Sequence, residues 1–192
     1  MRTLSSSLAG NRVSTADIRR AFKDSPVATF LSTGLGTGLS PFAPGTAGSA
    51  LALVLAWLLA RSISITAPSM TAAVGLLMSG LLIGLAGVPV STRTARVLGS
   101  KDPGCIVIDE IAGQFLASAA VPLFRYPNLR VELFAWLASF FFFRLFDVWK
   151  PGVIERLQDL PEGWGIVVDD VVAGLLAAGC VAAGASLLGF WP

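Results

Sequence analysis

The chain has 192 residues, of which 54% are hydrophobic and only 14% are charged, and its mean hydropathy is +0.74. Soluble domains normally carry about 25% charged residues, so this composition indicates one all-α domain embedded in a membrane. The net charge of +2 is too small for a basic nucleic-acid-binding surface, and the absence of histidine excludes catalysis or metal binding through that residue.

The first part of the chain, residues 1–28, is expected to be a cytosolic or interfacial segment, and residues 29–192 are expected to form the membrane-embedded domain. The stretch STADIRRAF places Ser14 and Thr15 ahead of apolar residues at helical spacing. This pattern predicts a short amphipathic helix that lies on the membrane surface.

Five apolar stretches follow, at residues 46–62, 70–90, 107–124, 131–147 and 168–191. Each is close to the roughly 20 residues that cross a bilayer, although the third and fourth are short. The sequence therefore predicts a polytopic bundle of about five membrane-embedded helices. With five crossings, all fourteen Lys and Arg residues except Arg61, Arg125 and Arg130 lie on the N-terminal side, which by the positive-inside rule is the cytoplasm.

The same topology brings five carboxylates to one membrane face, next to apolar residues. Fixed anions in such a place need a cation, and carboxylate oxygens are the ligands that Mg²⁺ prefers. Helix N-capping is the alternative for the second acidic doublet, although one Asp would suffice for it. The predicted metal-binding and catalytic residues are Asp109, Glu110, Asp147, Asp169 and Asp170.

The stretch FFFFRLFDVWKP ends an apolar run in Arg144, Asp147 and Lys150, which lie on one face of a helix. Charges at the edge of a membrane bundle often indicate a cavity or a partner, so Arg144 and Lys150 are candidate phosphate ligands. In the alternative interpretation the basic side chains extend to the lipid headgroups and Asp147 pairs with Arg144.

The stretch STGLGTGLSPFAPGTAGS, residues 32–49, lacks the patterns of nucleotide-binding loops. It offers free backbone N–H groups and leads into a helix N-terminus near Thr46, an arrangement that can bind anions. A re-entrant or flexible loop is an equal alternative. The candidate phosphate-binding positions in this loop are Gly36, Pro41, Gly45 and Thr46.

Carboxylates, basic groups and a glycine-rich loop on one membrane face favour metal-assisted hydrolysis of a lipid phosphate. Water is the expected nucleophile, and a carboxylate that holds no metal would orient it or accept its proton. The alternative is a divalent-cation transporter or channel without hydrolytic activity. That alternative predicts carboxylates spread through the membrane depth, whereas here they fall on one side.

Four motifs, TGLGTGLSPFAPGTAGS, GCIVIDEIAGQF, FRLFDVWKP and GWGIVVDDVVAG, resemble in order and spacing the phosphatidylglycerophosphatase A family, over residues 30–180. The resemblance implies a Mg²⁺-dependent, multi-pass enzyme of the bacterial inner membrane with its active site facing the cytoplasm. It implies removal of the terminal phosphate of phosphatidylglycerophosphate, a phospholipid, and leaves the oligomeric state open. The residues that it implicates are Gly36, Pro41, Pro44, Gly45, Thr46, Asp109, Glu110, Gly113, Arg144, Asp147, Lys150, Pro151, Asp169 and Asp170.

Overall fold

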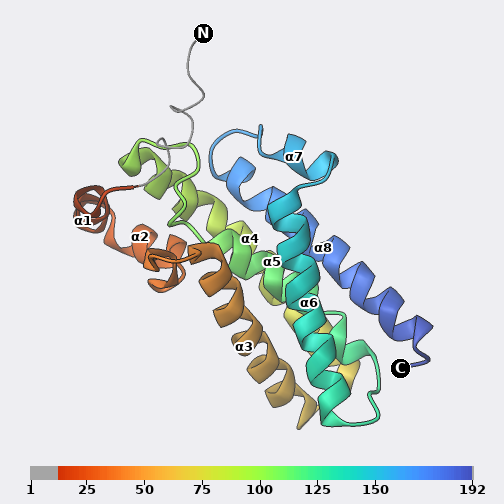
Figure 1. The fold of residues 1–192 in the computed structure, drawn as a ribbon. Helices are drawn as coiled ribbons and strands as arrows, with labels where there is room; N and C mark the ends of the chain where they lie inside the picture. The colour runs from red at the N-terminus through yellow and green to blue at the C-terminus, as the bar shows by residue number, and fades with distance from the viewer. Residues whose placement is uncertain (1–12, 192) are drawn as a thin grey trace.

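The structure, a computed structural model, describes residues 13–191, so most of the N-terminal segment expected over residues 1–28 is described and residues 1–12 lie outside it. All regular structure in the described residues is helical, which confirms the predicted all-α fold (Figure 1). The elements are α1 (Thr15–Asp24), α2 (Pro26–Ser32), η1 (Thr37–Leu39), α3 (Pro44–Ser64), α4 (Ser69–Leu98), α5 (Ile108–Ser118), η2 (Val121–Leu123), α6 (Leu129–Trp149), α7 (Val153–Leu157) and α8 (Gly163–Leu187).

Helix α1 is the predicted N-terminal helix, and its first turn is closed by a capping box. The Ser14 hydroxyl accepts a hydrogen bond from the Asp17 N–H at 3.2 Å, and the Asp17 carboxylate accepts one from the Ser14 N–H at 3.2 Å. Ala21 is the one buried residue of α1, and the helix contacts α2 and α4. The helix is therefore confirmed, while its position on the membrane surface and the domain boundary at residue 28 stay predictions.

The long helices alternate in direction along the chain (Figure 1). Helix α3 leaves the end of the bundle that holds α1, α2 and α7, and α4 returns to it; α5 leaves again, α6 returns, and α8 runs to the C-terminus. We call these the α7 end and the C-terminal end of the bundle. The starts of α5 and α8 and the last turn of α6 consequently meet at the α7 end, as the predicted topology requires.

Three helices in the described chain, α3, α4 and α8, are long and apolar enough to cross a membrane. Helix α6 has 21 residues but carries charges at both ends. Helix α5 has 11 residues, a length of about 16 Å, so it spans about half of a bilayer core. The expectation of one helix over residues 107–124 is therefore wrong, because α5 ends at Ser118 and the short η2 follows. The number of crossings stays a prediction.

Helix α5 is the centre of the bundle. It contacts α3, α4, α6 and α8, and Glu110 is its one residue that is not fully buried. The backbones of α5 and α8 touch where Gly113 meets Gly174, because a methyl group on Gly174 would overlap the Gly113 carbonyl. Small residues allow such close approach in membrane bundles. This contact fixes the depth of the two acidic doublets relative to each other.

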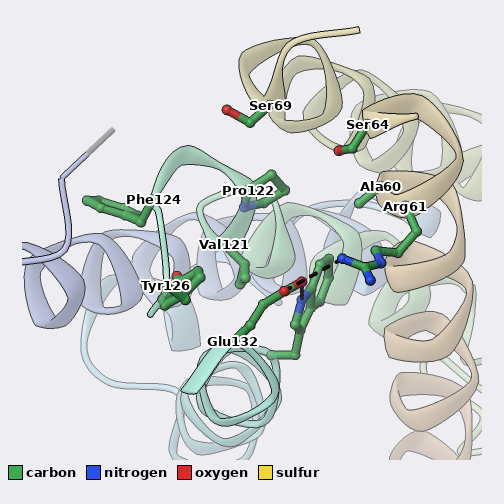
Figure 2. Close-up of a pocket in the computed structure, with 10 residues that line it drawn as sticks. Ala60, Arg61, Ser64, Ser69, Val121, Pro122, Phe124, Tyr126 and Glu132 are labelled. Atoms are coloured by element: carbon green, nitrogen blue, oxygen red, sulfur yellow. Dashed lines mark hydrogen bonds and ion pairs between the residues drawn. The ribbon is translucent and has the colours of Figure 1, made fainter. Parts of the chain in front are cut away.

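At the C-terminal end, an ion pair connects α3 to α6 beside a cavity of about 160 Å³ (Figure 2). The Arg61 guanidinium lies 3.7 Å from the carboxylate of Glu132, and the Trp136 indole N–H donates to the same carboxylate at 3.4 Å. The end of the bundle opposite the predicted site thus has its own polar contacts between helices.

Candidate active site

Three carboxylates from two helices converge at the α7 end of the bundle. Asp109 and Glu110 lie in the first turn of α5, and Asp170 lies in α8. One oxygen from each lies within 4.8 Å of the others. Asp109 and Asp170 are only 7% and 2% exposed, so water does not fully solvate their charges. The N-terminus of α5 offsets part of this charge, but only modestly.

Several oxygens of these carboxylates have no hydrogen-bond partner in the described part of the chain: Asp109 Oδ1, Glu110 Oε2 and Asp170 Oδ2 are all buried and unpaired. Burying unpaired carboxylates costs several kcal/mol unless a cation compensates them. The donors are all hard oxygen atoms, and one oxygen of each carboxylate lies close enough to the others to face one ion. This set of ligands therefore fits a divalent cation such as Mg²⁺.

The other two predicted carboxylates are already paired with basic side chains. Lys150 Nζ lies 2.6 Å from Asp169 Oδ2 and 3.9 Å from Asp147 Oδ1. Lys150 caps the C-terminus of α6 in the left-handed conformation, with φ +45°. Burial alone would lower the pKa of Lys150, but the hydrogen bond to Asp169 and the nearby carboxylates raise it above its ordinary value, so the ammonium stays charged.

Arg144 forms an ion pair with Asp147, one turn further along α6, and approaches the Ser49 hydroxyl at 3.5 Å. The pairing of Arg144 with Asp147, which the sequence left open, is confirmed. The side chains of Arg144 and Lys150 are 20% and 25% exposed, so both basic groups face the carboxylates rather than extending to the headgroups.

The second acidic doublet is not at a helix start. Helix α8 begins at Gly163 and its N-cap residue is Glu162, so Asp169 and Asp170 lie nearly two turns inside the helix, 1% and 2% exposed. The N-cap alternative for this doublet is therefore wrong. The expectation that α8 begins near residue 168 is also wrong, because the chain is helical from Gly163 on.

The glycine-rich loop meets the charged cluster at the start of α3. A methyl group on Gly45 would overlap the Glu110 carboxylate and lie 3.3 Å from Arg144 Nη1. No side chain caps α3, so its first N–H groups stay available to an anion. Gly36, with φ +96°, and the exposed Pro41 and Thr46 form no polar contact with the carboxylates in the described structure.

Three further residues belong to the cluster that the sequence did not single out. The fully buried Ser49 donates to the Gly45 carbonyl at 2.8 Å beside Arg144. The Gln158 amide donates to Asp169 Oδ2 at 3.1 Å. Asp102 lies in the loop before α5, and partial desolvation raises its pKa. Lys150 opposes this shift of the pKa, and the carboxylates of Asp169 and Asp147 add to it.

The chain resembles known proteins over most of its length. The family profile of phosphatidylglycerophosphatase A matches residues 30–185. The chain is 36% identical to phosphatidylglycerophosphatase A of Escherichia coli (strain K12) over 151 residues, 78% of each chain. It is 33% identical to phosphatidylglycerophosphatase A of Haemophilus influenzae over 148 residues, 77% of this chain and 82% of the relative.

A third relative, from Bacteroides thetaiotaomicron, is provisionally named a phosphatidylinositol-3-phosphatase. It is 34% identical over 145 residues, which cover 76% of this chain and 85% of the relative. No solved structure matches the chain significantly. With most of its length matched by the family profile and by these relatives, the chain belongs to the phosphatidylglycerophosphatase A family.

Proposed function

We propose that this protein is a Mg²⁺-dependent lipid phosphatase that hydrolyses the terminal phosphomonoester of phosphatidylglycerophosphate to phosphatidylglycerol and phosphate. One observation carries the proposal: three carboxylates, each with a buried and unpaired oxygen, lie beside two basic side chains that can bind a phosphate. The names of two relatives support the choice of substrate.

In this proposal Asp109, Glu110 and Asp170 would hold Mg²⁺. The bound ion supplies positive charge that offsets the charge of the phosphoryl oxygens. Arg144 and Lys150 bind the remaining phosphoryl oxygens, and the guanidinium can donate two parallel hydrogen bonds. The free N–H groups at the start of α3, around Gly45, add donors next to Arg144.

The roles of Asp147 and Asp169 follow from their partners. Each holds a basic side chain in place, which reduces the freedom that Arg144 and Lys150 lose on binding phosphate. When the phosphate draws these basic groups away, a released carboxylate can orient a water molecule or accept its proton. The wider assignment, in which all five carboxylates also bind metal, stays a prediction.

The proposed location is the bacterial inner membrane, with several crossings and the site facing the cytoplasm. The α7 end carries the carboxylates together with most of the basic residues, which favours the cytoplasmic side for this end. A lipid substrate would present its headgroup at this depth while its acyl chains stay in the bilayer. We therefore expect a soluble glycerol phosphate to be a poor substrate.

The test is phosphate release by the purified protein in detergent, with Mg²⁺ or with EDTA. Phosphatidylglycerophosphate is compared with phosphatidylinositol 3-phosphate of the same acyl chains. The variants Asp109→Asn and Asp170→Asn should stop turnover, while Asp159→Asn, in an exposed pair with Lys101, should not. Phosphate release in the presence of EDTA would contradict the proposed dependence on Mg²⁺. Ion flux in proteoliposomes without phosphate release would favour a transporter instead.

A further inference from the structure

The junction between α1 and α2 is fixed against the C-terminal part of α4 by buried polar contacts. The Ser32 hydroxyl donates to Thr94 at 2.9 Å, and the Thr29 hydroxyl donates to the carbonyl of Ala21 at 3.0 Å. Arg93 of α4 donates through Nε to the hydroxyl of Ser25, which is 5% exposed, at 2.8 Å. These contacts hold Arg93 in one place relative to α2.

Two adjoining cavities, of about 670 and 500 Å³, flank Arg93 and share Asp24, Ser25 and Pro89 as lining residues. We call them together the Arg93 groove. The larger cavity is bordered by polar groups, including Arg96 and Glu162. The smaller is lined on its α2 side by apolar residues. The groove therefore presents a polar part and an apolar part to the same ligand.

The positive charge available in the Arg93 groove comes from Arg93 itself. Arg96 is paired with Glu162, and Asp24 is paired with Arg20 at 3.5 Å. Within residues 13–191, Arg93 forms no ion pair, and Ser25 offers it a neutral acceptor. Its guanidinium therefore has donors left for an anion.

The polarity of the two walls of the groove indicates its depth in the membrane. On α4 the uncharged stretch 70–90 ends just before Arg93. On the other wall, α1 carries Arg19, Arg20 and Lys23, whereas α2 turns apolar side chains outward, with Val27 69% exposed. Both walls thus change from apolar to charged at the Ser25–Arg93 contact, as protein surfaces do at the level of lipid headgroups.

We propose that the Arg93 groove binds the phosphodiester headgroup of an anionic glycerophospholipid, at a site separate from the candidate active site. The phosphate oxygens accept hydrogen bonds from the Arg93 guanidinium, and the acyl chains lie along the apolar wall formed by Val27 and Ala28. Basic pockets between membrane helices on the cytoplasmic side commonly hold anionic headgroups in this way. The proposal requires no catalytic role of the groove.

Native mass spectrometry of the full chain in detergent tests the proposal. The lipids are phosphatidylserine and phosphatidylcholine with identical acyl chains, because phosphatidylserine is anionic but is neither a phosphomonoester nor the expected product. Wild-type protein should retain phosphatidylserine preferentially. Arg93→Gln should reduce that preference about fivefold, the equivalent of about 1 kcal/mol for one basic residue near the headgroups.

Two further variants make the result specific. Ser25→Asp keeps Arg93 but gives it a carboxylate partner, and Asp is also a good residue at the start of α2, so the same loss is expected. Arg130→Gln removes an exposed arginine at the C-terminal end and should change nothing. The proposal is overturned if wild-type protein shows no preference for phosphatidylserine, if folded Arg93→Gln or Ser25→Asp keeps it, or if Arg130→Gln loses it equally.

Discussion

The ammonium of Lys150 lies 2.6 Å from the carboxylate of Asp169 and joins the end of α6 to the interior of α8. The Asp169 side chain is 2% exposed, so solvent contributes little to stabilising its charge. Within the described chain the only other donor to Asp169 is the amide of Gln158. The apolar run of phenylalanines in α6 thus ends in a residue that neutralises a buried carboxylate.

Replacing Lys150 with Met should lower both stability and activity. Removing one partner of a buried ion pair leaves an uncompensated charge, which we expect to cost up to about 3 kcal/mol of unfolding free energy. Phosphate release should fall at least about 100-fold, since a charged phosphate ligand is lost. Thermal unfolding in detergent and phosphate release measure the two effects.

Lys101→Met is the matched control, because Lys101 and Asp159 are exposed and lie 3.8 Å apart. Such surface pairs contribute about 0–1 kcal/mol, so little change is expected. Lys150→Arg should recover most of the stability. An equal effect of Lys101→Met and Lys150→Met would contradict the assigned role of Lys150.

Gly45→Ala should impair the site without unfolding the protein. The added methyl group would overlap the Glu110 carboxylate, which must move away from Asp109 and Asp170. We expect at least about a tenfold loss of phosphate release, because small displacements in a preorganised site are costly. Gly184→Ala is the control, since a methyl group there meets open space. Equal activity in the two variants would show that Glu110 tolerates displacement.

The sequence predicted the presence of the long helices better than their ends. Long apolar runs predicted the helices α3, α4 and α8, because bilayer-spanning helices require that length, although α8 begins at Gly163, ahead of the predicted run. The end of α5 at Ser118 could not be predicted from the sequence, because the apolar run continues to residue 124. The start of α8 was missed because two glycines disfavour a helix locally, whereas the Gly163 N–H donates to Thr92 of α4 at 2.9 Å.

The sequence predicted which helices contribute residues to the candidate site, but not all of the ion pairs within it. Alternation of direction sufficed to bring both acidic doublets and Asp147 to one end. The pair of Arg144 with Asp147 could be suggested from their spacing on one helix. The pair of Lys150 with Asp169, and the oxygens that remain unpaired, depend on how separate helices pack, which the sequence does not encode locally. Gln158 lies between helices with no motif around it, so only the packing of the chain identifies it.

Adding Mg²⁺ should stabilise the protein, and Asp170→Asn should abolish that effect. At a free Mg²⁺ concentration about 100 times Kd, binding to the folded state adds about 2.7 kcal/mol to the free energy of unfolding. In EDTA, Asp170→Asn should unfold at a higher temperature than wild type. The reason is that Asn removes one of three neighbouring negative charges, which repel one another when no cation is bound. Thermal unfolding with Mg²⁺ and with EDTA measures both effects. The same Mg²⁺-dependent shift in both proteins would place the ion elsewhere.

Glu132→Gln, at the C-terminal end, should leave phosphate release unchanged. Its ion pair with Arg61 is partly exposed, so its loss should cost less than about 1 kcal/mol of unfolding free energy. Glutamine can still accept the hydrogen bond from the Trp136 indole, which keeps the wall of the cavity in place. Because Glu132 lies at the C-terminal end of the bundle, away from the candidate site, this variant tests whether the chemistry is confined to the α7 end. A tenfold loss of phosphate release from folded Glu132→Gln would show that the two ends of the bundle are coupled.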